Sequence, residues 1–159
     1  MKEREFKALY NDFGRKLYNF ILWLTQNRSA SDDILQNVFI KVWNCYKAPS
    51  NSDEQQKWLF AIARNASLDY FRKTARISRT CTRFRQEYYS PAIDPDASFT
   101  WQELGNLEEK EQSILYLHIK IGYTYKEIAD ILSLNESQVR VKAFRALKKL
   151  RNCLEKKEI

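Results

Sequence analysis

The residues YTYKEIADILSLNESQVRVKAFRALKKLR, from Tyr123 to Arg151, determine how the rest of this 159-residue chain is interpreted. Thr124 is followed three residues later by Glu127, and Asn135 by Gln138. Each pair is the reciprocal capping pattern that opens a helix. Apolar residues at helical spacing follow each cap. The stretch therefore predicts two short helices joined by a tight turn.

The second of these helices is strongly basic. Its predicted buried face consists of Val139, Ala143, Ala146, Leu147, Leu150 and Leu154. Its other faces carry Arg140, Lys142, Arg145, Lys148, Lys149 and Arg151. This pattern is typical of a helix-turn-helix, in which the second helix enters the DNA major groove. A merely solvated basic face is the alternative, but the coincidence of two caps and a turn favours DNA binding.

The candidate DNA contacts of this helix are Ser137, Gln138, Arg140, Val141, Lys142, Phe144, Arg145 and Lys148. Arg140 and Arg145 are suited to bidentate contacts with guanine, and Gln138 to pairing with adenine. Phe144 is suited to a thymine methyl group, with packing against the preceding helix as an equal alternative. The serine and the two lysines are candidates for phosphate contacts, which position a protein without reading sequence.

The charge of the chain supports a polyanionic partner. The net charge is +7 and the pI is about 9.3. From Glu87 to Glu136 there are three cations and ten anions, whereas Ser137 to Ile159 holds eight cations and two anions. Such segregation indicates a basic DNA-binding segment beside an acidic segment.

Several classes of function are not expected. The three cysteines are far apart and form no CxxC pair, so neither a zinc site nor a disulfide framework is indicated. His118 is the only histidine, which excludes an HExxH site, and the three glycines form no glycine-rich phosphate loop. We expect no enzyme, no cofactor, no metal and no small-molecule substrate. The first ten residues lack the apolar core of a signal peptide, so a cytoplasmic location is expected.

Two amphipathic helices are predicted at the start of the chain. The apolar stripe of the first is Phe6, Leu9, Tyr10, Phe13, Leu17, Phe20, Ile21 and Leu24, and that of the second is Ile34, Leu35, Val38, Phe39, Val42, Trp43 and Tyr46. Ser29 or Ser31 is expected to cap the second helix, with Asp32 and Asp33 in its first turn. Ile40 lies off the stripe among polar residues. It is either an ordinary exposed apolar residue or the centre of a partner-binding face.

A third helix is predicted after a loop from Ala48 to Gln56. Its apolar side is Trp58, Leu59, Ile62, Ala63, Ala66, Tyr70 and Phe71, with Arg64, Arg72 and Lys73 pointing elsewhere. Between Tyr70 and Gln86 there are six cations and no acid, which makes a second basic patch. The proline-containing segment from Tyr88 to Thr100 reads as a linker.

The expected fold is therefore all-α, with two small helical domains joined by a flexible linker. The domains are expected at residues 1–76 and 101–159, with the linker over 77–100 and the helix-turn-helix in the second domain. One or two helices from Trp101, ending near Gly122, are expected to pack under it.

Four motifs occur in order along the chain: SDDILQNVFIKVW from Ser31, WLFAIARNASLDYFRK from Trp58, LEEKEQSILYL from Leu107 and YKEIADIL from Tyr125. Together they resemble bacterial RNA polymerase sigma factors of the sigma-70 family. The best match is the compact extracytoplasmic-function (ECF) group, which keeps only the two essential DNA-binding domains. The resemblance covers nearly the whole chain and implies a dissociable specificity subunit of RNA polymerase.

The resemblance also implies roles for three surfaces. Asp33, Gln36, Asn37 and Ile40 would dock on the clamp helices of core RNA polymerase. The loop from Ser50 to Gln56, with Asn51, would hold a base flipped from the −10 promoter element, and Arg64, Asn65, Asp69, Arg72 and Lys73 would lie along the upstream edge of that element. The C-terminal domain would read the −35 element of promoter DNA. The family commonly has an anti-sigma factor anchored in the membrane.

The chain departs from the family pattern at a few positions. Asn37 stands where glutamate is usual, Ser137-Gln138 replaces Gly-Thr, and Val141 and Ala143 replace serine and leucine. The change at Asn37 bears on contact with polymerase, and the changes in the recognition helix bear on which promoter is preferred. Glu108 replaces a proline, and we expect this change to have little chemical consequence.

Two other functions fit parts of the sequence. A stand-alone helix-turn-helix regulator would bind duplex DNA tightly without polymerase. A sigma mimic that titrates an anti-sigma factor would have no need of two cation-rich patches.

Overall fold

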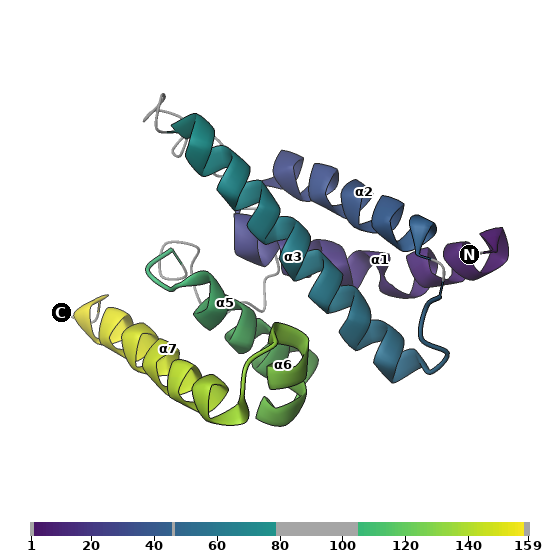
Figure 1. Cartoon of the computed structure of the whole chain (residues 1–159). Coiled ribbons are helices and arrows are strands. Elements are labelled where there is room, and N and C mark those ends of the chain that lie inside the picture. The colour runs from purple at the N-terminus through teal and green to yellow at the C-terminus, as the bar shows by residue number, and fades with distance from the viewer. Residues whose placement is uncertain (1, 46, 79–104, 158–159) are drawn as a thin grey trace. The chain divides into compact units, whose positions relative to one another are not determined.

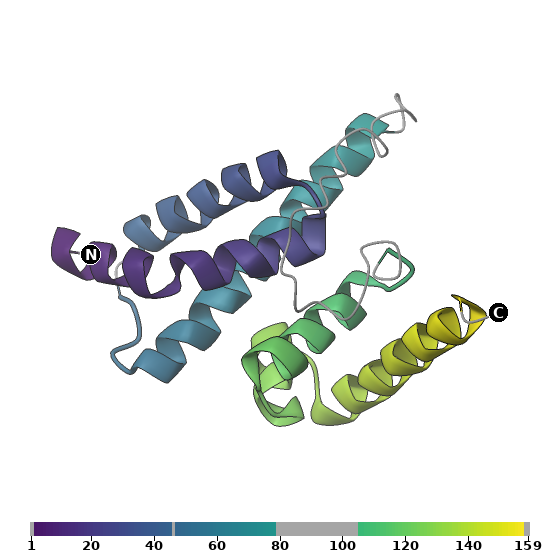
Figure 2. The ribbon, with the colours of Figure 1, turned by 180° about the vertical axis from the view of Figure 1, so that it is seen from behind.

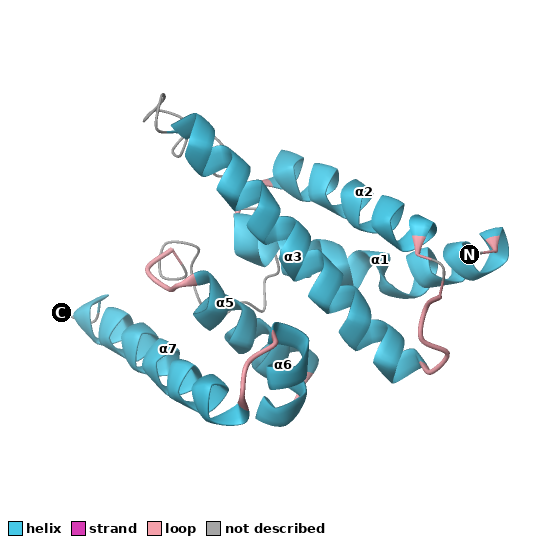
Figure 3. Cartoon of the chain, in the orientation of Figure 1, coloured by secondary structure: helices cyan, strands magenta, loops and turns pink. Residues whose placement is uncertain are grey.

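The computed structural model describes residues 2–45, 47–78 and 105–157, and every regular element within these ranges is a helix (Figure 3). The chain divides into two compact units, Met1–Pro91 and Ala92–Ile159. The all-α fold with two helical domains is thereby confirmed. The predicted linker lies outside the described residues except for 77 and 78, so the predicted domain bounds stay a prediction. Among the described helices, none is long and apolar enough to cross a membrane.

Three helices build the first unit: α1 (Glu3–Thr25), α2 (Arg28–Asn44) and α3 (Ser52–Ser78). Each packs against the other two (Figure 1, and from behind in Figure 2). The fully buried side chains between them include Leu17, Phe20, Ile21, Val38, Leu59 and Phe60. The rings of Phe20 and Phe60 meet edge to face with centroids 5.2 Å apart, an arrangement that aromatic pairs favour. Burial of this apolar surface holds the three helices together.

Helix α2 begins one turn earlier than predicted. Its cap is Asn27, whose Oδ1 accepts a hydrogen bond from the Ala30 N–H at 3.0 Å, so the expectation of a cap at Ser29 or Ser31 is wrong. Ser31 is instead fully buried, and its Oγ lies 2.8 Å from Thr25 Oγ1. Asp32 and Asp33 therefore fall in the second turn of the helix, and their predicted place in the first turn is wrong.

Helix α3 also begins earlier than predicted, at Ser52, inside the expected loop. Asn51 caps it, because its Oδ1 accepts a hydrogen bond from the Asp53 N–H at 2.9 Å. The buried side of α3 is also rotated relative to the prediction. Phe60 is fully buried, whereas Trp58 is half-buried.

The second unit contains α5 (Glu109–Leu115), a π-helical segment η1 (Tyr116–Ile121), α6 (Tyr125–Leu132) and α7 (Glu136–Lys157). Helix α7 packs against both α5 and α6. The apolar core of this unit is formed by Ile114, Leu115, Leu117, Ile128, Val139, Ala146 and Leu150. Gly122 ends η1 with a φ of 88°, a left-handed conformation that glycine adopts without strain, which confirms the predicted helix end.

The predicted buried face of α7 is confirmed only in part. Val139, Ala143, Ala146 and Leu150 are buried, but Leu147 and Leu154 are 44% and 40% exposed, which corrects their assignment to the core. These two leucines lie at the edge of the apolar stripe. Of the helices expected between Trp101 and Gly122, the residues Trp101 and Leu104 lie outside the described residues.

Candidate nucleic-acid interface

Helices α6 and α7 form the predicted helix-turn-helix with both predicted caps. Thr124 Oγ1 accepts from the Glu127 N–H at 3.3 Å, and a Glu127 carboxylate oxygen accepts from the Thr124 N–H at 2.9 Å. In α7, Asn135 Oδ1 accepts from the Gln138 N–H at 2.8 Å, and Gln138 Oε1 accepts from the Asn135 N–H at 3.2 Å. Both capping boxes are thus closed. The first fixes where α6 begins and the second fixes where α7 begins.

The solvent-facing side of α7 mixes cations with apolar groups. Ser137, Gln138, Val141, Phe144, Arg145 and Lys148 are all exposed. Phe144 is 69% exposed, so its alternative assignment, packing against the preceding helix, is wrong. Val141 is 48% exposed. Because apolar groups of this size are normally buried, an exposed pair of them beside Arg145 is suited to thymine methyl groups next to a guanine.

The exposed side chain of Arg140 makes contacts within its own unit. Its Nη2 and Nε donate to Glu136 Oε1 at 2.6 and 3.2 Å, and its guanidinium lies 5.8 Å from the ring centroid of Tyr125. The hydrogen bond and the charge of Glu136 raise the pKa of Arg140. The ring of His118 also stacks on Tyr125, with centroids 4.6 Å apart.

Two carboxylates at the start of α5 hold cations of α7. Lys149 Nζ donates to both carboxylate oxygens of Glu111, at 3.0 and 2.9 Å. Lys142 Nζ lies 3.7 Å from Glu108 Oε2. The change from the family's proline to Glu108 was expected to have little consequence, but it gives one of the candidate phosphate contacts an ion-pair partner.

Helix α3 presents a second polar surface. Asn65 and Lys73 are exposed, and Asp69 forms ion pairs with Arg72 at 3.4 Å and with Lys41 of α2 at 3.5 Å. Arg64 was expected to point away from the apolar side, but it is only 8% exposed. The reason is its position, four residues after the buried Phe60 and three before Ser67, on the side of the helix that meets the core.

Only part of the second basic patch falls on residues whose side chains the structure describes. Arg72 and Lys73 do, whereas the side chain of Arg76 and all of Arg79, Arg83 and Arg85 lie outside them.

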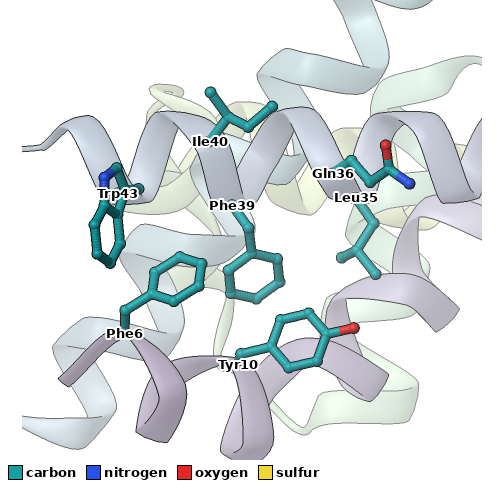
Figure 4. A pocket seen from close by; sticks show the side chains of 7 residues that line it. All are labelled: Phe6, Tyr10, Leu35, Gln36, Phe39, Ile40 and Trp43. Carbon is teal, nitrogen blue, oxygen red and sulfur yellow. The ribbon is translucent and has the colours of Figure 1, made fainter. Parts of the chain in front are cut away.

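The predicted polymerase-binding residues share one side of α2. Asp33, Gln36, Asn37 and Ile40 are all exposed, and Ile40 is 58% exposed, as the sequence indicated. Two of them, Gln36 and Ile40, also border a pocket of about 420 Å³. It lies between the start of α1 and the second half of α2 (Figure 4).

The aromatic side chains of this pocket were predicted as core, which is confirmed for Phe39 and not for the others. The ring of Phe6 contacts those of Phe39 and Trp43 edge to face, with centroids 5.8 and 5.1 Å apart. Tyr10 and Trp43 are 50% and 44% exposed, which corrects their assignment to the buried stripes. The signal for this aromatic cluster was the pairing of two aromatic residues four apart on each helix.

Two helical units, the second with a helix-turn-helix whose outer face is basic and apolar, define a DNA-binding transcription protein. Comparison with known proteins gives the family. Residues 9–77 match the Sigma-70 region 2 family and residues 104–152 match the Sigma-70 region 4 family. The chain belongs to the sigma-70 family of RNA polymerase sigma factors, in its ECF group. It is an alternative sigma factor, which binds core RNA polymerase and directs promoter-specific transcription initiation.

Individual relatives agree with this assignment. The ECF RNA polymerase sigma factor SigX of Bacillus subtilis is 28% identical over 165 residues, covering 96% of this chain and 85% of the relative. The ECF sigma factor SigM of the same organism is 26% identical, covering 90% and 91%. Among solved structures, the sigma factor RpoE in complex with the anti-sigma factor NepR from Bartonella quintana has the same fold, with a TM-score of 0.75, 22% identity, and 96% and 98% of the two chains covered.

Proposed function

We propose that the two units divide promoter recognition between them. The second unit reads the −35 element by placing α7 in the major groove, where Arg140 and Arg145 contact guanines and Gln138 an adenine. Val141 and Phe144 contact thymine methyl groups, and Ser137, Lys142 and Lys148 hold phosphates. The observation that carries this proposal is the outer face of the capped helix α7, on which exposed cations surround a phenylalanine that is 69% exposed.

The first unit engages the −10 element through α3. The exposed side chains of Asn65, Asp69, Arg72 and Lys73 support a contact along one edge of that element. The segment around Asn51 holds an extruded base, and the contacts made there offset an unstacking cost of a few kcal/mol. The burial of Arg64 favours a supporting role for this side chain within the unit rather than direct contact with DNA.

Core RNA polymerase docks on the exposed face of α2 that carries Asp33, Gln36, Asn37 and Ile40. An exposed isoleucine inside a ring of polar groups has the composition of a protein-binding site with an apolar centre and a polar rim. The chain acts by binding rather than by catalysis, in the cytoplasm, and uses no cofactor.

We also propose regulation by an anti-sigma factor. Two solved structures with this fold contain a second protein. One is RpoE with the anti-sigma factor NepR. The other is CnrH with the cytosolic domain of CnrY, which has a TM-score of 0.66 and 22% identity. For this chain, the partner would be a protein that covers the polymerase-binding face.

Run-off transcription with purified core polymerase tests the proposal. Genomic fragments, including the promoter of the chain's own gene, are transcribed with and without the protein. We expect discrete transcripts only in its presence, and loss of these transcripts with the variant Arg145→Ala at unchanged polymerase binding. A chain that never associates with core polymerase would overturn the proposal. Tight binding of a duplex without polymerase would instead favour a stand-alone regulator.

A further inference from the structure

The ion pair between Glu108 and Lys142 differs from the others at the recognition helix. Lys142 lies on the flank of α7 that faces α5, next to the exposed recognition face. Its side chain is 23% exposed, whereas that of Glu108 is 66% exposed, and the charged atoms are 3.7 Å apart. The pair therefore lies at the border between the protein and the surface proposed to meet DNA.

The neighbouring pair shows what a structural ion pair looks like in the same unit. The side chain of Glu111 is 3% exposed, and both of its carboxylate oxygens accept from Lys149 within 3.0 Å. Glu111 also accepts from the Glu108 N–H at 3.0 Å, so it joins the start of α5 to α7. Glu108 is also the N-cap residue of α5. Its ion pair with Lys142 is longer and more exposed than that of Glu111, and such a pair exchanges readily for another anion.

We propose that Glu108 sets the DNA affinity of this sigma factor by competing with a DNA phosphate for Lys142. The proposal rests on the proposed role of Lys142 as a phosphate contact. In the free chain the Glu108 carboxylate holds the ammonium group. On promoter DNA the ammonium group moves to a phosphate, and Glu108 is left to the solvent beside the polyanion. Each of these changes reduces the net gain from the lysine–phosphate contact.

The competition has a specific signature in the salt dependence of binding. A lysine that neutralises a DNA phosphate releases condensed counterions and adds about 0.9 to the slope of log affinity against log salt concentration. When the lysine leaves a carboxylate to do so, that carboxylate attracts a cation from solution, which cancels part of the release. Replacing Glu108 should therefore tighten binding and also steepen the slope. A purely structural role of Glu108 would not steepen it.

The test uses the full chain and a random-sequence DNA duplex, because phosphate contacts do not depend on sequence. Affinity is measured by fluorescence anisotropy over a range of salt concentrations. The variants are Glu108→Gln, Lys142→Gln and the double variant. The matched control is Asp130→Asn, which makes the same change in net charge at an exposed position of α6. The backbone N–H of residue 108, which donates to Glu111, is retained in Glu108→Gln.

We expect Glu108→Gln to tighten duplex binding about two- to fivefold beyond the control, the range set by an exposed ion pair. The slope should steepen by up to about 0.9, and both effects should vanish when Lys142 is also replaced. Equal effects of Glu108→Gln and Asp130→Asn would overturn the inference. If Lys142→Gln still lost affinity in that case, the proposed phosphate contact of Lys142 would stand. No effect of Lys142→Gln in either background would refute that contact itself, and the inference with it.

Discussion

The ion pair between Glu111 and Lys149 leads to a prediction that runs against simple exposure. The Glu111 side chain is 3% exposed and that of Lys149 is 43% exposed. A ranking by burial alone makes Glu111 the more costly residue to replace. We expect the reverse for two substitutions that keep the size of the side chain, Glu111→Gln and Lys149→Met.

The reason is which charge remains after each substitution. In Glu111→Gln, the remaining lysine is already open to water and the amide oxygen still accepts from the Glu108 N–H, so the cost is about 1 kcal/mol. In Lys149→Met, a carboxylate stays buried without its cation. Removing one partner of a buried pair costs about 3–5 kcal/mol, which we discount to about 2–4 kcal/mol because solvent reaches the lysine end of this pair.

Amide hydrogen exchange measures this difference within one unit of the chain. Each 1.4 kcal/mol corresponds to about a tenfold change in an opening equilibrium. Amides of α5 and α7 should exchange one and a half to three orders of magnitude faster in Lys149→Met, and less than one order faster in Glu111→Gln. Lys148→Met is the control, since Lys148 is exposed and has no ion pair within the described residues, and amides of α1 to α3 should not change in any variant. Faster exchange in Glu111→Gln than in Lys149→Met would refute the argument from the buried charge.

Three further predictions test the other surfaces. Arg145→Ala should cost about 1–3 kcal/mol on the cognate promoter and relax its selectivity at one base pair, measured by competition binding of the holoenzyme; equal weakening on every sequence would mean that Arg145 contacts only phosphate. Ile40→Ala should weaken binding to core polymerase by about 1–2 kcal/mol, because apolar burial is lost. Ile119→Ala, at a similarly exposed position of the other unit, should not weaken it. Equal effects of the two variants in a pull-down titration would mean that Ile40 is not in the interface. Asn27→Ala should destabilise α2 by about 1 kcal/mol through loss of its cap, and Ser29→Ala should have no such effect, as seen in exchange of the α2 amides; the opposite order would contradict the observed cap.

The helix starts show which local signals can be read from sequence. Both capping boxes of the helix-turn-helix were predicted, because each is complete within four residues. The start of α2 was missed because Asn27, Ser29 and Ser31 are all good caps. The choice among them depends on a tertiary contact, the hydrogen bond between Ser31 and Thr25 at 2.8 Å, which draws Ser31 into the core. Local sequence cannot reveal that contact.

The apolar stripes show a second limit. Periodicity indicates which side of a helix is apolar, but not how far the neighbouring helix covers it. Trp43 and Tyr10 continue the stripes of α2 and α1, yet both remain about half exposed because they line an open pocket rather than the core. Arg64 shows the converse, since a residue counted as polar is buried by its position between Phe60 and Ser67. Its long aliphatic stem allows this.

The ion pairs along α7 bear on how strongly the free chain is expected to bind DNA. Of the six cations on its predicted basic faces, four are paired with carboxylates of this same unit: Arg140, Lys142, Lys149 and Arg151. Arg145 and Lys148 have no ion pair within the described residues. Because each paired cation must give up a protein partner to gain a phosphate, we expect the duplex affinity of the free unit to be low. If α2 docks on polymerase as proposed, α7 is held close to the DNA, and this raises its effective concentration there without any new DNA contact. With weak affinity of its own, α7 is then expected to read promoters in the holoenzyme and to leave the rest of the chromosome unoccupied when the sigma factor is free.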